Sequence, residues 1–99
     1  MNINKTQNNG KTTLTLSGRL DTTTSPALLE TLINELEEAK NVELDFAAVA
    51  YVSSAGLRVL LLGEKTAKAN GGRLTLLNVS EEILEVFEMT GFADMLKIE

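Results

Sequence analysis

Two serines and a glycine lie where a predicted strand is followed by a predicted helix, in the segment VELDFAAVAYVSSAGLRVLL at residues 42–61. Ser53 and Ser54 each carry a hydroxyl that a kinase can phosphorylate. The N-terminus of a helix favours added negative charge, because its first N–H groups lack helical partners and its dipole is positive there. Ser53 and Ser54 are therefore candidates for a phosphorylation switch. The alternative is that Ser54 only caps the helix, which would stabilise it by about 1 kcal/mol.

The residue types that most enzymes depend on are missing from this chain. It contains no cysteine and no histidine, so Ser-His-Asp and Cys-His catalysis, disulfides and the usual zinc ligand sets are excluded. Most carboxylates fall on predicted solvent faces, where they are ordinary solvation. We expect no enzymatic activity, no metal and no cofactor.

Composition favours a single soluble globular domain. The chain has 99 residues, 43% hydrophobic content and a net charge of −5. Its lysines and arginines are scattered along the sequence, which argues against a nucleic-acid partner. No apolar run is long enough for a membrane span, and residues 1–5 lack the features of a secretory signal. We expect one domain over residues 1–99, a cytoplasmic location and no membrane insertion.

The first half of the chain predicts a hairpin, a helix and a strand. Alternating residues 13–16 and a shorter strand at 3–7 flank Asn8-Asn9-Gly10, which favours a β-hairpin. A helix is expected to begin near Ser25 or Pro26, with leucines on one face and residues 30, 34, 35, 37 and 38 on a solvated face. Residues 42–46 alternate again, so the helix makes a crossover between parallel strands.

The second half repeats this pattern. Residues 47–52 are expected to carry the chain across the sheet edge to the serines, and a helix then extends to about residue 69. Asn70-Gly71-Gly72 ends it, and residues 73–77 form a strand. Ser80 can cap a third helix that stops near Gly91. Residues 93–99 fit either a half-turn or an edge strand.

These elements predict an α/β fold in which a small mixed sheet of four to five strands packs against three to four helices. Loops at the carboxyl ends of parallel strands are where such sheets bind ligands and partners. Ser53 and Ser54 follow one of these strands, and Asp21 is expected as an exposed carboxylate near the same end. Asp21 also fits an ordinary turn residue, and Gly56 fits either a close backbone approach or simple local packing.

The order of these motifs resembles the STAS domain family, and in particular the bacterial anti-sigma factor antagonists. The resemblance covers nearly the whole chain. Its most specific part is Y-V-S-S-A-G-L-R-V-L-L at residues 51–61. It also rests on G-R-L-D at 18–21, L-D-F at 44–46, Gly71-Gly72 and V-F-E-M-T-G-F at 86–92.

The resemblance implies a regulatory partner switch without catalysis by the chain itself. In that family an anti-sigma factor with serine kinase activity phosphorylates the antagonist, and a PPM-type phosphatase removes the phosphate. The unphosphorylated antagonist binds the anti-sigma factor and frees the sigma factor. By this resemblance Ser54 is the phosphoacceptor and Asp21 lies near the surface that contacts the kinase. The implied partner-binding residues are Asp21, Thr22, Ser53, Ser54, Ala55, Gly56 and Arg58.

The chain departs from the family pattern at Ser53, where many phosphorylated antagonists have aspartate. The change removes a fixed negative charge beside the acceptor, and either alters kinase preference or lets Ser53 compete as acceptor. A stand-alone STAS subunit of a phospholipid-type ABC transport complex is the alternative function, with the junction as a docking edge and no phosphorylation. A nucleotide hydrolase is a third possibility, although the phosphate-binding motif G-x-x-x-x-G-K-[ST] is absent.

Overall fold

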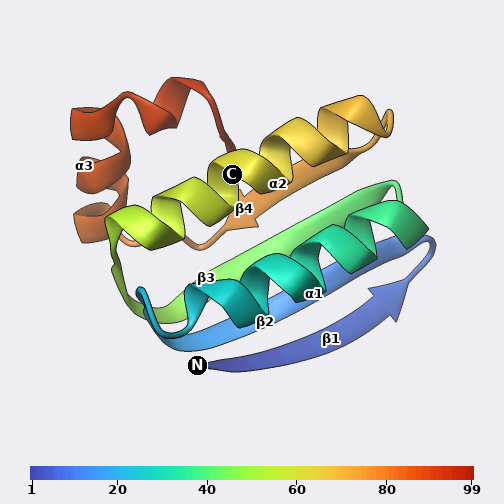
Figure 1. Cartoon of the computed structure of the whole chain (residues 1–99), viewed down its shortest axis with the longest axis horizontal. Helices are drawn as coiled ribbons and strands as arrows, with labels where there is room; N and C mark the ends of the chain where they lie inside the picture. Colours follow the sequence, from blue (N-terminus) through green and yellow to red (C-terminus); the bar gives the residue numbers. More distant parts are fainter.

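Strands and helices alternate along the chain after an initial hairpin. A computed structural model describes residues 1–99, the whole sequence, and Figure 1 shows its arrangement. The strands are β1 (Asn2–Asn8), β2 (Lys11–Leu20), β3 (Asn41–Val52), β4 (Arg73–Leu77) and β5 (Lys97–Ile98). The helices are α1 (Ser25–Glu38), α2 (Ser54–Ala69), α3 (Glu81–Thr90) and the short 3₁₀ helix η1 (Phe92–Asp94).

The sheet has five strands in the order β1-β2-β3-β4-β5. β1 runs antiparallel to β2, while β2, β3, β4 and β5 run parallel to one another. At the hairpin turn Asn9 and Gly10 have φ values of 53° and 80°, the left-handed pair that a two-residue turn requires. The hairpin, the crossover and the mixed sheet confirm the fold predicted from the sequence.

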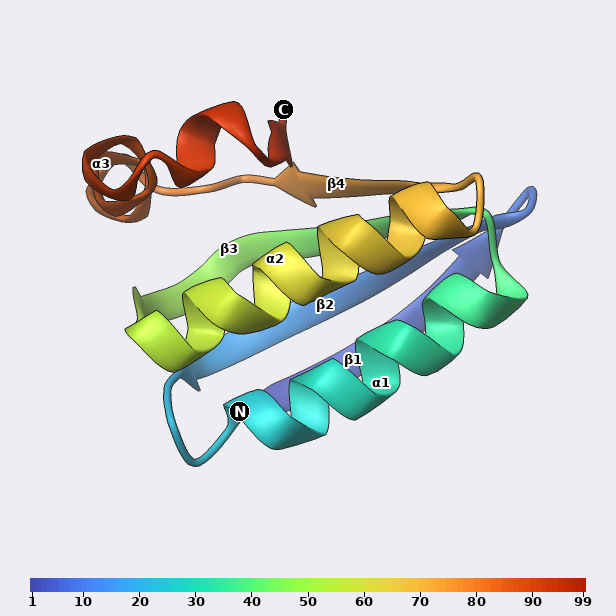
Figure 2. The same ribbon diagram turned by 45° about the horizontal axis from the view of Figure 1, so that its top comes forward.

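Helices α1 and α2 lie side by side over one face of the sheet (Figure 2). They can approach closely because Gly63 of α2 has no Cβ. A Cβ at this position would lie 2.6 Å from Cδ2 of Leu32 in α1. Leucines from both helices and the inward residues of the strands form one core: Leu14, Leu16, Leu28, Leu32, Leu36, Leu44, Phe46, Leu57 and Leu60. The serine junction therefore lies between β3 and α2, each of which buries one face in this core.

Helix α3 begins and ends where the sequence predicts. The Ser80 hydroxyl accepts a hydrogen bond from the Ile83 N–H at 3.3 Å, which makes Ser80 its N-cap. Gly91 follows its last residue with φ of 80°, the left-handed conformation that ends many helices. The sequence left open whether the tail is a half-turn or an edge strand, and the tail contains both. The short helix η1 is followed by β5, which pairs with β4.

Two expectations about these elements are wrong. Residues 47–52 do not cross the sheet edge but form the second half of β3, and they pair with β2 as far as Val52. The register shifts between Thr15 and Ser17 and between Gly18 and Arg19, and these irregularities remove the alternation that identifies a strand.

Glu35 was expected on the solvated face of α1 but is buried, with 8% of its surface exposed. Its Oε2 atom forms an ion pair with Lys5 Nζ of β1 at 2.8 Å. The hydrogen bond to Glu35 raises the pKa of Lys5. The pair fastens the edge strand to α1, and a helical pattern alone cannot reveal this contact between distant residues.

Candidate functional site

Strands β2 and β3 end side by side, and this places the loops that follow them next to each other. Leu20 pairs with Val52 at the last step of the register. The Ser53 N–H then donates to the Leu20 carbonyl at 2.9 Å. Figure 1 shows the first turns of α1 and α2 at the same end of the molecule. The sequence-predicted site residues of the two loops are thus brought together at the carboxyl ends of parallel strands.

Ser53, and not Ser54, is the N-cap of α2. Its backbone is extended and its hydroxyl accepts a hydrogen bond from the Gly56 N–H at 3.3 Å. The prediction that Ser54 is the cap is therefore wrong. Ser54 is already the first helical residue, and Ser53 is the residue placed to reach the Gly56 N–H. Ser53 is half-buried and Ser54 is exposed.

The Ser54 hydroxyl is the accessible one at this junction. No hydrogen bond within the chain involves its side chain, whereas the Ser53 hydroxyl is used in the cap. As Ser54 and Ala55 precede the first N–H that bonds within the helix, their own N–H groups lack helical acceptors. An added phosphate on Ser54 would lie beside these donors.

Gly56 is buried and holds the first turn of α2 against the end of β2. A Cβ at this position would lie 2.7 Å from Leu20 Cγ and 3.1 Å from the Leu20 carbonyl oxygen. Any larger residue would push the serine turn away from β2. Both interpretations of Gly56 describe this contact, because the turn approaches the Leu20 backbone and also packs on the Leu20 side chain.

Asp21 organises the loop between β2 and α1 with its carboxylate. Oδ1 accepts from the Thr23 N–H at 3.1 Å, the Thr23 hydroxyl at 2.8 Å and the Thr24 N–H at 3.2 Å. The hydrogen bonds from Thr23 and Thr24 hold the pKa of Asp21 below its usual range. Asp21 is half-buried rather than exposed as expected, so the turn-residue reading fits its contacts. Thr22 remains exposed at the tip of the loop.

Two residues near the junction belong to the motifs quoted above but were not predicted as site residues. The Arg19 guanidinium lies 4.2 Å from the centre of the Tyr51 ring, and its Nε is 3.7 Å from Asp21 Oδ2. Arg19 and Tyr51 are partners in the β2–β3 register. Only that register, with its shifts, brings the two residues together, so no local sequence signal predicts the contact.

A shallow groove runs between the first turns of α1 and α2. It has a volume of about 250 Å³ and is lined by Thr22, Ser25, Pro26, Leu29, Ala55, Arg58, Val59 and Leu62. Thr22, Ala55 and Arg58 among the predicted site residues thus share one surface. We call the groove together with Asp21, Ser53 and Ser54 the junction surface. Leu29, Val59 and Leu62 give it an apolar floor that the sequence did not mark as functional.

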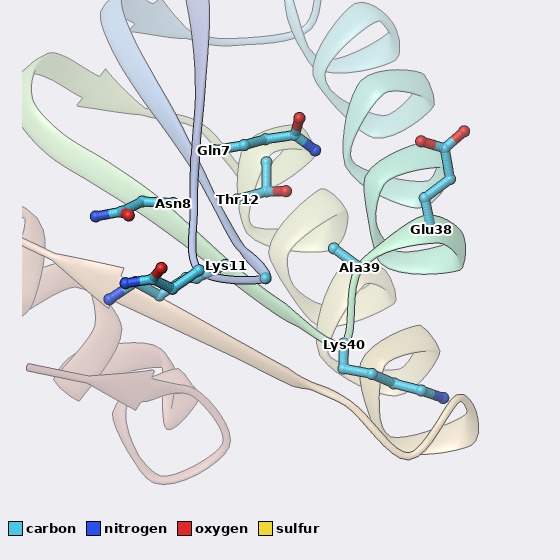
Figure 3. A pocket seen from close by; sticks show the side chains of 9 residues that line it. Gln7, Asn8, Lys11, Thr12, Glu38, Ala39 and Lys40 are labelled. Atoms are coloured by element: carbon cyan, nitrogen blue, oxygen red, sulfur yellow. The ribbon is translucent and has the colours of Figure 1, made fainter.

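A larger hollow of about 500 Å³ lies at the other end of the sheet, between the hairpin tip and the end of α1 (Figure 3). Its polar lining includes Gln7, Lys11, Thr12 and Glu38, none of which belongs to the predicted site. No group of acidic residues is arranged to hold a metal ion. None of the helices is long and apolar enough to cross a membrane.

Comparison with known proteins agrees with this geometry. Residues 2–99 match the model of the STAS domain family. The anti-sigma-B factor antagonist of Bacillus subtilis strain 168 is 31% identical over 98 residues, which are 99% of this chain and 90% of that protein. The match therefore extends over both loops of the junction surface.

Two solved structures have the same fold. The anti-sigma factor antagonist SpoIIAA in its unphosphorylated form has a TM-score of 0.77 at 17% identity, covering 99% of this chain and 87% of that one. The Bacillus cell fate determinant SpoIIAA in its phosphorylated form has a TM-score of 0.76 at 18% identity, covering 99% and 91%.

Proposed function

Because this chain belongs to the STAS domain family, we propose that it is an anti-sigma factor antagonist switched by phosphorylation of Ser54. Unphosphorylated, it binds a kinase-type anti-sigma factor through the junction surface and so releases the sigma factor. Phosphorylated, it dissociates, and a PPM-type phosphatase returns it to the binding form. The observation that carries the proposal is the exposed, unbonded Ser54 hydroxyl on the first helical residue after β3, in a chain 31% identical to an anti-sigma-B factor antagonist.

The proposed transfer requires an accessible hydroxyl, and this favours Ser54 over Ser53. The Ser54 oxygen attacks the γ-phosphorus of ATP held by the partner, the bond to the leaving ADP breaks, and the hydroxyl proton is released. Ser53 would have to give up its hydrogen bond to the Gly56 N–H before it could react. The same bond explains how serine can replace the family's aspartate here, because both side chains accept at an N-cap.

The fold is expected to survive this modification, whereas the bound state is not. A phosphate adds about −1.5 to −2 charge at pH 7. At the start of α2 that charge meets free N–H groups and the positive end of the helix dipole. In the complex it would have to be desolvated at the edge of an apolar groove, which is costly without a matching cation on the partner. The charge therefore acts on docking more than on folding.

Phosphate uptake tests the acceptor assignment directly. The chain is incubated with the serine kinase anti-sigma factor of its own genome and ATP, and intact mass and peptide mapping locate the product. We expect one phosphate on wild type and on Ser53→Ala, and none on Ser54→Ala. Equal uptake by Ser54→Ala would refute the assignment to Ser54. Co-purification with a transport ATPase, without phosphate uptake by any variant, would refute the proposed function.

A further inference from the structure

The helix that carries Ser54 differs in charge from the other two. α1 and α3 contain no lysine or arginine, and their acidic residues are Glu30, Glu35, Glu37, Glu38, Glu81, Glu82, Glu85 and Glu88. α2 instead carries Arg58, Lys65 and Lys68, with Glu64 as its one acid. In a chain of net charge −5, the predicted phosphoacceptor thus begins the one basic helix.

Arg58 is the cation of α2 that can reach Ser54. Residues four apart on a helix are neighbours on its surface, with about 5–6 Å between their Cβ atoms. Side chains on a helix also lean toward its N-terminus, so the residue at the later position extends back over the earlier one. An anion at Ser54 with a cation at Arg58 has the more favourable order of such a pair.

Arg58 is also free to make this contact. Its side chain is exposed, and the ion pairs of the chain involve Lys5, Lys11 and Arg19 but not Arg58. Arg19, the other arginine at this end, already lies on Tyr51 and near Asp21. The Asp21 carboxylate accepts from Thr23 and Thr24 through Oδ1, its Oδ2 faces Arg19, and it forms no ion pair with Arg58.

We infer that Arg58 is the intramolecular counter-ion of phosphorylated Ser54. This inference rests on the proposed phosphorylation and adds how the modification acts on the junction surface. The guanidinium turns from the rim of the groove, where it is available to an acidic side chain of the partner, to the phosphate one turn away. One phosphate thus adds an anion to the docking surface and withdraws a cation from it.

The test encodes phosphoserine at position 54 during translation, so that no kinase is needed. The second pKa of the phosphate is measured by ³¹P NMR, together with the Nε–H resonance of Arg58. Other charges at this end are Arg19, Asp21, the amino group of Met1 beside Gly18 and, further along α1, Glu30, and all of them stay in place. We expect Arg58→Gln to raise the phosphate pKa by roughly 0.3 to 0.6 unit, because the dianion loses its counter-ion.

Two further variants separate the pairing of Arg58 with phosphorylated Ser54, here called the clamp, from general charge effects. Lys65→Gln removes the same charge from the same helix but lies about 16 Å along the axis from Ser54, beyond the Debye length at physiological salt. It should shift the pKa by less than about 0.1 unit. Arg58→Lys should give an intermediate shift, since it keeps the charge and loses the fork of donors. Equal shifts for Arg58→Gln and Lys65→Gln, or none for either, would overturn the inference.

The outcome for the clamp is independent of the outcome for the proposed function. If the phosphate titration depends on Arg58 while the phosphorylated chain still binds the anti-sigma factor, the clamp stands and the partner switch fails. If phosphorylation abolishes binding and the Arg58 Nε–H resonance does not move, the switch stands and the clamp is wrong.

Discussion

Replacing Ser53 by alanine should destabilise the protein, although the side chain is small and lies outside the helix. The change removes the oxygen that accepts from the Gly56 N–H at 3.3 Å. Loss of an N-cap costs about 1 kcal/mol, with a range of roughly 0.5–2. The length of the bond places the cost low in that range, while the burial of Gly56, whose N–H loses its partner, raises it. We therefore expect a loss of about 1 kcal/mol.

Urea unfolding followed by circular dichroism measures this loss. With a slope of about 2 kcal/mol per molar urea, the midpoint of Ser53→Ala should fall by about 0.5 M, and its Tm by about 4–8 °C. Ser53→Asp keeps an acceptor and adds a favourable charge at the helix dipole, so it should match or exceed wild type. Ser54→Ala is exposed and should stay within about 0.5 kcal/mol of wild type. A larger loss for Ser54→Ala than for Ser53→Ala would refute the assignment of the cap.

Three further changes test the packing and charges around the junction. Gly56→Ala places a methyl group 2.7 Å from Leu20 Cγ. Overpacking of about 1–3 kcal/mol, less about 1 kcal/mol gained in helix propensity, gives a net loss of stability of about 0–2 kcal/mol in urea unfolding. The lowered pKa of Asp21 stabilises the fold at pH values above the pKa of an unfolded aspartate, about 3.9. This contribution is lost as the pH falls. Because Asp21→Asn lacks it, the Tm of that variant should decline less steeply than that of wild type below about pH 4. The raised pKa of Lys5 stabilises the fold below about pH 10.4, and this contribution is lost as the pH rises. The stability difference between wild type and Lys5→Ala should therefore stay constant from pH 8 to about pH 10 and shrink above that pH, and an unchanged difference at higher pH would contradict the pairing with Glu35.

Local signals in the sequence were sufficient for most of the fold. Asn9 and Gly10 favour a turn because both residues tolerate positive φ. Ser80 and Gly91 mark the ends of α3 through hydrogen bonds to residues a few positions away. The alternation of β2 and the leucine spacing of α1 reflect the face that each element buries. Such features are encoded within one element, so they can be read without knowing its neighbours.

The sequence predictions were wrong where the environment of a residue depends on a partner far away in the sequence. Glu35 is buried because Lys5, 30 positions away on β1, supplies its counter-ion, and no helical period contains that information. In the second half of β3, register shifts against β2 interrupt the alternation of buried and exposed side chains. The choice between Ser53 and Ser54 as the cap depended on where the strand ends, which the Ser53 N–H bond to Leu20 fixes. The contact between Arg19 and Tyr51 was not predicted for the same reason.

The central claim is that one phosphate on Ser54 controls docking to a kinase-type anti-sigma factor. Isothermal titration of the anti-sigma factor encoded in the same genome, with the unmodified chain and with the chain carrying encoded phosphoserine at position 54, tests it most directly. We expect saturable binding by the unmodified chain and a loss of at least about 100-fold in affinity on phosphorylation, corresponding to about 2.7 kcal/mol. Equal affinities for the two forms would contradict it.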